Sequence, residues 1–384
     1  MSNDLLQALK KGGHATQTRH WKGLLPGLTS GGTSPRRLLN LAWLAFRSCF
    51  GLLLGSKNRV VIVRSTPPLL HLPVATICRW RGIRCVFWLM DYHPVIEQRM
   101  WGHKAWLSPF LRWLDRWDRR ELSSFSDVVV LDQAMAVLVT TRNPSANVII
   151  HPTWGNLRHE SVNLKPEAEN LNADSTPPKV SGLKSHPSPP SASASSDSGS
   201  SPAITFAYLG NFGQGHGWAT LSACIRETSR LRRVRLLCIG VPAAAEPAFA
   251  ALALETGANL ELHPRMDFAP AAALLQERSA SWGCVAMKAE LAGCLSPSKF
   301  SGYLAAGVPL LYAGPPQTNA WQVCVKFGGG VALDDSAKPE EITNAAKRLA
   351  EESIRLNAVA GASRAREHFD SFNGTTLAHL LTQR

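Results

Sequence analysis

The sequence predicts two doubly wound α/β domains that face each other across a central cleft. Short apolar strand patterns alternate with helix patterns, first up to about residue 156 and again from residue 204 onward. Strands that alternate with helices form parallel sheets with right-handed crossovers, so each half of the chain predicts one such domain. A Ser/Pro-rich stretch separates the two halves, which also differ in charge.

The chain has 384 residues, enough for two domains of ordinary size. We predict a first domain over residues 1–156, a linker over 157–203 and a second domain from 204 onward. Residues 166–203 are rich in Ser and Pro and nearly free of large apolar side chains, so burial cannot offset the entropy of ordering them. We expect a disordered tether, either a plain flexible linker or a regulated segment that binds a partner.

The first half begins with "DLLQALKKGGHAT", which is typical of the first helix of such a domain and the turn that follows it. No apolar strand precedes this helix, so we expect the first strand to be missing. Either the start codon lies further upstream or the domain has lost a central strand. The remaining strands are expected at 59–65, 83–91, 127–132 and 147–154, and the helices at 69–82, ended by Gly82, and at 103–125.

The second half repeats the alternation of strand and helix patterns. Its strands are expected at 204–210, 234–240, 259–264, 282–288 and 308–313. Its helices are expected at 218–231, 246–257, 268–280 and 297–306, followed by a helical region over about 338–384.

Positive charge is concentrated in the first half. Up to Asn156 there are 20 Lys and Arg against 8 Asp and Glu, a net charge of +12, whereas the remainder has 21 against 20 and a net charge of +1. Nine of the twelve tryptophans also lie in the first half. Two surfaces with different partners are therefore expected. No nucleic-acid-binding module accompanies the charge, so we expect no nucleic-acid partner.

The eight cysteines are scattered, with no C-x-x-C and no Cys/His pair at the spacing of a zinc site. This pattern is typical of reduced, buried thiols, and we expect a cytoplasmic protein. The N-terminus lacks the long apolar core of a signal peptide. The stretch that comes closest to a membrane span, Leu38–Gly55, carries Arg47 near its centre, so we expect a buried helix there.

A short helix is expected within "CLSPSKFSGYLAAGVPLLYAGPP", residues 294–316. Ser296 suits its N-cap, Pro297 suits its first turn, and Gly307 suits its end. The first turn of a helix presents unpaired backbone N–H groups and about half a positive charge.

Ser298 adds a hydroxyl and Lys299 adds a cation to this first turn. Together they predict an anion site suited to a diphosphate. The alternative is an ordinary capped helix with a solvated lysine.

A glycine-rich loop, "YLGNFGQGHGW" (208–218), follows the first strand of the second half. Glycines let the backbone approach a ligand closely, and those of this loop are Gly210, Gly213, Gly215 and Gly217. The spacing is not a G-x-G-x-x-G, so the loop alone is a weak signal. His216 either donates to a phosphate or caps the next helix. The glycine-rich loop and the start of the helix at 297–306 both lie at strand–helix junctions of the same half, so together they predict a phosphate site better than either does alone.

Polar side chains also follow two other strands. Asp91 in "FWLMDYHP" lies at the end of an apolar strand, where ligands bind in doubly wound sheets, although it could instead cap a turn. His93 is either functional or a structural histidine before Pro94. Lys288, which ends "WGCVAMK", and Glu290, which follows it, either line the cleft or are solvated.

Several of these segments resemble the family-four glycosyltransferases. "PSKFSGYLAAGVPLLYAGP" resembles their "PSK…YLAAG.PvL" segment, and "YLGNFGQGHGW" resembles their donor-domain glycine loop. "STPPLLHLPVATICRWRGIRCVFWLMDYHP" resembles their acceptor-domain segment, in which a D-x-x-P follows a strand. "IIHPTWGN" is similar to the turn that ends their first domain, and "SRAREHFDSFN" to their C-terminal crossing helix. The motifs occur in the same order, and the bacterial enzymes that build capsule, O-antigen or exopolysaccharide are the nearest in character.

The resemblance implies the GT-B fold, with two facing Rossmann-like domains. It implies an acceptor-binding domain over 1–156, a nucleotide-sugar-binding domain over 204–360, and a helix over 361–384 that crosses back to the first domain. The implied activity is a retaining transfer from a nucleotide-sugar to a saccharide acceptor, without an obligatory metal or other cofactor.

Site residues follow from the same resemblance. Gly210, Asn211 and Gly213 would lie near the diphosphate, and Ser298 and Lys299 would hold its phosphates. Stabilising the leaving diphosphate would be the main catalytic effect of Lys299.

On the acceptor side, Asp91 and His93 would lie near the reacting hydroxyl. The sequence departs from the family at two positions. Many relatives carry two glutamates eight residues apart, where this chain has Cys294 and Gly302; Glu290 is the nearest substitute for the first. Relatives also carry an Arg and a Lys after the glycine loop that are absent here.

An aromatic stripe lies in "WGHKAWLSPFLRWLDRWDRR", with Trp106, Phe110, Trp113 and Trp117 on roughly one helical side among arginines. We expect core packing against the sheet, with an interfacial membrane surface as the alternative. A peripheral position at the inner face of the cell membrane would bring the enzyme to a lipid-linked acceptor. Two other functions remain open: a degenerate homologue that binds nucleotide or membrane as a partner subunit, and a nucleotide-sugar epimerase of similar architecture.

Overall fold

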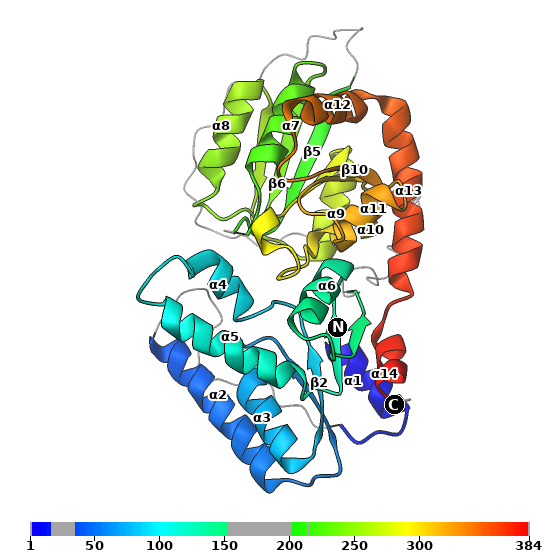
Figure 1. Ribbon diagram of the computed structural model, residues 1–384. Helices are drawn as coiled ribbons and strands as arrows, with labels where there is room; N and C mark the ends of the chain where they lie inside the picture. The colour runs from blue at the N-terminus through cyan, green and yellow to red at the C-terminus, as the bar shows by residue number, and fades with distance from the viewer. Residues whose placement is uncertain (1, 17–34, 153–201, 214, 383–384) are drawn as a thin grey trace, which may run out of the picture.

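The computed structural model describes residues 2–16, 35–152, 202–213 and 215–382. These residues form two parallel sheets, each covered by helices (Figure 1). The predicted α/β architecture with two parallel sheets is confirmed. The predicted linker over 157–203 lies almost wholly outside the described residues.

The first domain contains a four-stranded parallel sheet in the order β1-β2-β3-β4, so neighbours in the chain are neighbours in the sheet. Its elements are α1 (Ser2–Lys11), α2 (Pro35–Leu54), β1 (Val60–Arg64), α3 (His71–Arg81), β2 (Arg84–Trp88), α4 (Val95–Trp101), α5 (Ser108–Leu122), β3 (Asp127–Val130), α6 (Gln133–Arg142) and β4 (Val148–Ile150).

Strand β2 shows why the strands of this sheet are apolar at consecutive positions. Cys85 and Phe87 lie in the core on the side of α3 and α6, while Val86 and Trp88 lie in a second core with residues of α1 and of the C-terminal helix α14 (Gly374–Thr382). Both faces of the sheet are therefore covered, as in other parallel sheets.

The second domain contains a six-stranded parallel sheet in the order β10-β9-β8-β5-β6-β7. Its elements are β5 (Ile204–Leu209), α7 (Ala219–Ser229), β6 (Val234–Ile239), α8 (Glu246–Thr256), β7 (Asn259–His263), α9 (Phe268–Glu277), β8 (Trp282–Ala286), the 3-10 helix η1 (Ala289–Leu291), α10 (Lys299–Ala305), β9 (Leu310–Ala313), α11 (Asn319–Val325), β10 (Gly330–Leu333) and α12 (Pro339–Ala350).

The strand order of this second sheet reverses between β5 and β8. From β5 the chain adds β6 and β7 on one side, and then returns to add β8, β9 and β10 on the other. In doubly wound sheets, ligands bind in the crevice at the carboxyl ends of the strands that flank such a reversal. The loops after β5 and β8 are therefore the places to look for a site.

Two helices complete the chain. Helix α13 (Glu352–Asp370) runs from the second domain toward the first, and α14 packs beside α1 on the first domain (Figure 1). The two ends of the described chain thus lie together on one face of the first sheet.

Several elements differ from the sequence-based expectation. Helices α4 and α11 are not predicted because seven residues are too few to show helical periodicity. Helix α6 is not predicted because its apolar residues are spread around the helix, and β10 is not predicted because it follows a Gly-rich turn. The long helix expected at 103–125 is α5. The helix expected at 297–306 is α10, whose N-cap is Ser298. The predicted cap, Ser296, is therefore wrong by two residues.

Helix α2 is not buried, contrary to expectation. It packs against α3, yet Trp43, Phe46, Phe50 and Leu54 are exposed on it, because only one side of this largely apolar helix contacts the domain. Over the described ranges, we find no helix long and apolar enough to cross a membrane.

Replacing Gly361 on α13 tests the packing of that helix on the second domain. An added Cβ would lie 2.3 Å from the backbone of Gly328, so Gly361→Ala is expected to lower the free energy of unfolding by about 2 kcal/mol. Alanine favours helix by about 1 kcal/mol over glycine, so a purely local effect would have the opposite sign. Denaturant unfolding measures the difference, with the exposed Ser363→Ala on the same helix as the control.

Candidate functional site

The loop after β5 begins with a left-handed glycine. Gly210 has φ +75°, a conformation that side-chain-bearing residues rarely adopt, and its N–H donates to the carbonyl of Ile239 at 2.7 Å. At the other end of the loop, a Cβ on Gly217 would lie 2.4 Å from Oδ1 of Asp335. The backbone conformation therefore favours glycine at Gly210, whereas a side chain at Gly217 would require Asp335 to move.

Lys299, the first residue of α10, directs its ammonium group into this loop. Nζ donates to the hydroxyl of Tyr208 and to the carbonyl oxygen of Asn211, both at 2.5 Å, and lies 3.1 Å from Nε2 of His216. It also lies 4.1 Å from the centroid of the Tyr208 ring, within cation–π range. The structure thus brings together a strand end, a glycine loop and a helix start.

No carboxylate pairs with this ammonium group in the part of the chain that the structure describes, and its protein partners are neutral oxygen, nitrogen and ring atoms. Burial consequently lowers the pKa of Lys299 to about 7. Burial, together with the Lys299 charge, lowers the pKa of His216 to about 4, so this imidazole is neutral at pH 7.

The neutral His216 has two alternative arrangements. Its Nδ1 lies 3.0 Å from the carbonyl oxygen of Gly213 and 2.9 Å from the amide nitrogen of the same residue. While Nε2 accepts from Lys299, the proton must be on Nδ1 and the carbonyl of Gly213 accepts it. If Nε2 carries the proton instead, Nδ1 accepts from the Gly213 N–H.

Ser298 is the N-cap of α10. It is exposed, its side chain makes no capping hydrogen bond, and α10 has only seven residues. The part of Ser298 in a diphosphate site stays a prediction, and the Lys299 side chain is the group that the structure places in the glycine loop. Ser296 is directed instead toward the first domain, where its hydroxyl hydrogen-bonds to the Asp132 side chain. Burial raises the pKa of Asp132 to about 6, and this hydrogen bond opposes the rise.

Lys288 and Glu290 form an exposed pair after β8. Their side chains are 3.6 Å apart and 42% and 57% exposed, so they are largely solvated. The Lys288 backbone has a clearer role, because its N–H donates to the carbonyl of Gly215 at 3.0 Å and ties this segment to the glycine loop.

The acceptor-side candidates lie in the turn after β2. The hydroxyl of Ser65 accepts from the Asp91 N–H at 3.1 Å and so fixes the start of this turn. Burial raises the pKa of Asp91, and the charges of His93 and Arg64 oppose the shift. His93 Nδ1 lies 2.5 Å from Oε1 of Glu97, one turn further on.

Direct hydrogen bonds join this turn and α6 to the second domain. The Tyr92 N–H donates to the Cys294 carbonyl at 2.8 Å. The Ala134 N–H donates to the Gln317 carbonyl at 3.1 Å, and the Asn319 side chain donates to the Leu131 carbonyl at 2.9 Å. The carboxyl ends of both sheets therefore meet, with Asp91 and His93 on one side and the segment leading to Lys299 on the other.

The sequence did not single out three residues of this region. Tyr208 supports Lys299, Arg64 faces Asp91, and Glu97 holds His93. Tyr208 could have been found from its place in β5 next to the glycine loop. Arg64 and Glu97 are ordinary charged residues in the sequence, and only the fold makes them neighbours of the turn.

The positions where relatives carry glutamates serve packing here. Cys294 is fully buried in the core of the first domain. A Cβ on Gly302 would meet Leu209 and Phe268 at 3.7 Å, in apolar surroundings. Among the described residues we also find no group of three His, Cys, Asp or Glu side chains arranged for a metal ion.

The aromatic stripe, which begins at Trp106 in the turn before α5 and continues along that helix, lies largely at the surface. Trp106, Phe110 and Trp113 are 78%, 52% and 48% exposed. Only Trp117 is directed inward, where its Nε1 donates to the Thr76 hydroxyl at 3.2 Å. The predicted core packing is thus wrong for the three exposed rings. Exposed arginines accompany them, namely Arg112, Arg116, Arg119 and Arg120.

Comparison with known proteins places the fold. No protein-family model matches the sequence, and no curated protein matches it. Among solved structures, WaaG, a glycosyltransferase involved in lipopolysaccharide biosynthesis, matches with a TM-score of 0.57 at 12% identity, covering 99% of this chain and 95% of that one.

Two further solved structures match almost as well. Sucrose-phosphate synthase from Thermosynechococcus elongatus has a TM-score of 0.56 at 11% identity, covering 93% of this chain and 80% of its own. HepE from Anabaena, in complex with UDP, has a TM-score of 0.56 at 10% identity, covering 90% and 83%. The predicted resemblance to GT-B glycosyltransferases is confirmed for the fold.

Replacing Lys299 tests whether its charge is held at a cost to stability. The pKa of a free lysine is about 10.4, so between pH 7 and 10 the unfolded chain binds more protons than the folded one and stability rises with pH. Lys299→Met should therefore raise the free energy of unfolding by about 1–2 kcal/mol at pH 6, and by less at pH 9. Denaturant unfolding at the two pH values measures this, and a loss of stability at pH 6 would contradict it.

Proposed function

We propose that this protein, which has the GT-B fold, transfers a sugar from a nucleotide-diphosphate sugar to a saccharide acceptor. The observation that carries the proposal is the Lys299 ammonium group, enclosed by Tyr208, Asn211 and His216 with no carboxylate partner among the described residues. A cation held this way beside the reversal of a parallel sheet is suited to an anion brought by a ligand. A diphosphate is such an anion, and it accepts charge-assisted hydrogen bonds from lysine.

Donor binding would exchange the internal partners of Lys299 for phosphate oxygens. Once Nζ turns to a phosphate, Nε2 of His216 no longer accepts from it and can carry the ring proton. That nitrogen then donates to the diphosphate, while Nδ1 accepts from the Gly213 N–H at the 2.9 Å separation already present. His216 thus becomes a neutral phosphate donor without gaining charge.

The same residues would stabilise the departing diphosphate. As the bond between the anomeric carbon and the phosphate oxygen breaks, negative charge develops on the leaving group next to Lys299. The acceptor hydroxyl forms the new bond to the anomeric carbon, and its proton passes to the departing diphosphate. Asp91, with His93 beside it, would orient that hydroxyl. We propose retention of configuration, as the family resemblance implies.

We further propose that the acceptor is lipid-linked and that the protein works peripherally at the inner face of the cell membrane. Exposed rings on α5 and α2 lie on the domain that carries the +12 charge, and α3 packs against both of these helices. Tryptophans among arginines suit the headgroup region of an anionic bilayer.

A thermal-shift panel of UDP, GDP and their sugars tests the donor site. A nucleotide at a hundred times its dissociation constant should stabilise the protein by about 2.7 kcal/mol. Lys299→Ala should abolish the shift, whereas Lys347→Ala, exposed on α12 of the same domain, should retain it. No shift with any nucleotide would remove the proposal. A shift without transfer to any acceptor would favour a nucleotide-binding partner subunit.

Vesicle sedimentation tests the membrane surface. The triple change Trp106→Ser, Phe110→Ser and Trp113→Ser should weaken binding to vesicles rich in phosphatidylglycerol by about tenfold or more, because it removes the three exposed rings of the stripe in α5 and the turn before it. Binding of the unchanged protein should fall as salt rises. Leu254→Ser, 86% exposed on α8 of the second domain, is the control. Equal binding by both variants would rule out this surface.

A further inference from the structure

The turn that carries Asp91 and His93 depends on the residue between them. Tyr92 is fully buried, its N–H donates to Cys294 of the second domain, and its carbonyl accepts from Ile96 in the first turn of α4 at 3.0 Å. Its backbone is thus shared between the turn, α4 and the second domain. Whatever fixes the Tyr92 side chain also fixes the two candidate acceptor residues on either side of it.

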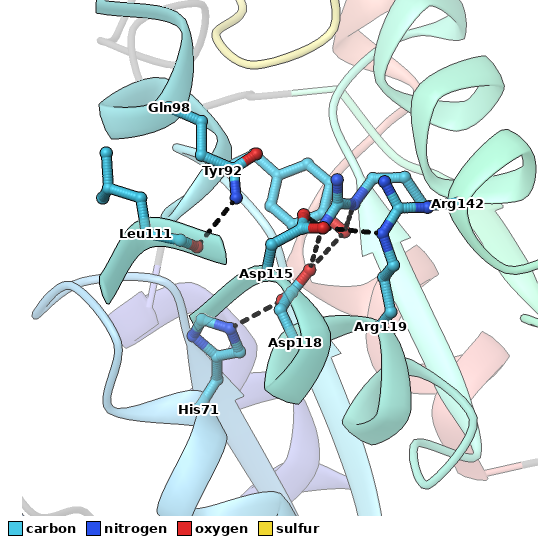
Figure 2. A network of polar contacts seen from close by, with 8 residues as sticks. All are labelled: His71, Tyr92, Gln98, Leu111, Asp115, Asp118, Arg119 and Arg142. Carbon is cyan, nitrogen blue, oxygen red and sulfur yellow. Dashed lines mark hydrogen bonds and ion pairs between the residues drawn. The ribbon is translucent and has the colours of Figure 1, made fainter. Parts of the chain in front are cut away.

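The Tyr92 hydroxyl is held by a buried ionic network (Figure 2). It donates to Oδ2 of Asp118 at 3.1 Å and accepts from Nε of Arg142 at 3.0 Å. The Arg142 guanidinium also lies 5.3 Å from the centroid of the Tyr92 ring. The hydroxyl therefore has both a donor and an acceptor partner. Both hydrogen bonds can form only while the Tyr92 ring keeps its present orientation.

Asp118 is the centre of this network. Its carboxylate is fully buried and binds three elements at once: Tyr92 of the turn, Nη2 of Arg142 on α6 at 2.8 Å, and Nε2 of His71 on α3 at 3.1 Å. Arg142 makes a second ion pair with Asp115, one turn earlier on α5, at 2.6 Å. Figure 2 shows these side chains converging from α3, α5, α6 and the turn.

A buried ion pair is weak evidence for stability, because apolar residues of similar volume often stabilise as well or better. Buried polar groups that pair with one another can still specify a conformation, and the side chains of Tyr92, Asp118 and Arg142 are paired in this way. Here that conformation includes two contacts with the second domain. Arg142 ends α6, whose first turn bonds to Gln317, and Tyr92 bonds to Cys294.

We propose that Asp118 is a positioning residue for the acceptor side of the site. Through Tyr92 and Arg142 it holds the turn of Asp91 and His93 at a fixed place against the second domain. The effect of Asp118 on sugar transfer rests on the proposed function. Its effect on the contact between the turn and the second domain does not.

Helix α5 supplies a matched control for Asp118. Glu121 is also almost fully buried on this helix and is paired with Arg79 of α3 at 3.1 Å, and its carboxylate also accepts from the Ser124 hydroxyl, so these contacts lie away from the turn. Asp118→Asn and Glu121→Gln remove the same kind of charge from the same helix. A difference between them reports the connection to Tyr92 rather than a general loss of stability.

Amide hydrogen exchange at Tyr92 is the first measurement. Exchange should be about tenfold faster or more in Asp118→Asn and within about twofold of the unchanged protein in Glu121→Gln. Tyr92→Phe, which keeps the ring and loses only the hydroxyl, should also speed exchange and serves if Asp118→Asn fails to fold. Equal exchange in all the proteins would overturn the proposal.

Transfer kinetics are the second measurement. In Asp118→Asn, kcat/KM for the acceptor should fall about tenfold while the dissociation constant for the nucleotide stays within about twofold, because the donor loop is untouched. A parallel loss of nucleotide affinity would overturn the positioning role. Absence of nucleotide binding in the unchanged protein would instead count against the proposed function, and the exchange measurement would still decide the role of Asp118.

Discussion

The contact of the Lys299 ammonium group with the glycine loop is the interaction around which the second domain's site is built. It joins the end of β5, the loop and the start of α10 through one group of atoms. Because all its partners are neutral, the charge is held without compensation and remains available to an anion. The end of β5, the glycine loop and the start of α10 are thus already held together before a ligand binds, which lowers the entropy cost of binding a diphosphate.

Polar contacts join the two domains at the carboxyl ends of their strands, next to the packing of Cys294 and Leu295 on the core of the first domain. Most use a backbone carbonyl as the acceptor, as with Cys294, Gln317 and Leu131. Arg99 of α4 adds two more, donating to the carbonyls of Glu290 and Ala292 at 2.9 and 2.7 Å. Backbone acceptors depend little on side-chain identity, which explains why sequence motifs gave no sign of this contact.

The residues that depart from the family pattern are explained by packing. Cys294 lies in the core of the first domain although it belongs to a loop of the second, and burial raises the pKa of its thiol to about 11. Gly302 lies on α10 opposite Leu209 and Phe268. Lys299 thus carries more of the proposed donor recognition than a lysine aided by two glutamates would.

The sequence by itself determined the two parallel sheets, the positions of most strands and the glycine loop next to Lys299. These depend on local signals: apolar runs, the alternation of strand and helix, and glycines at turns. The tertiary structure alone decided that Lys299 bonds to Tyr208, that the rings of Trp106, Phe110 and Trp113 are exposed, and that Asp118 reaches Tyr92. In each case the same residue pattern fits two environments, and only the packing of elements distant in the chain selects between them.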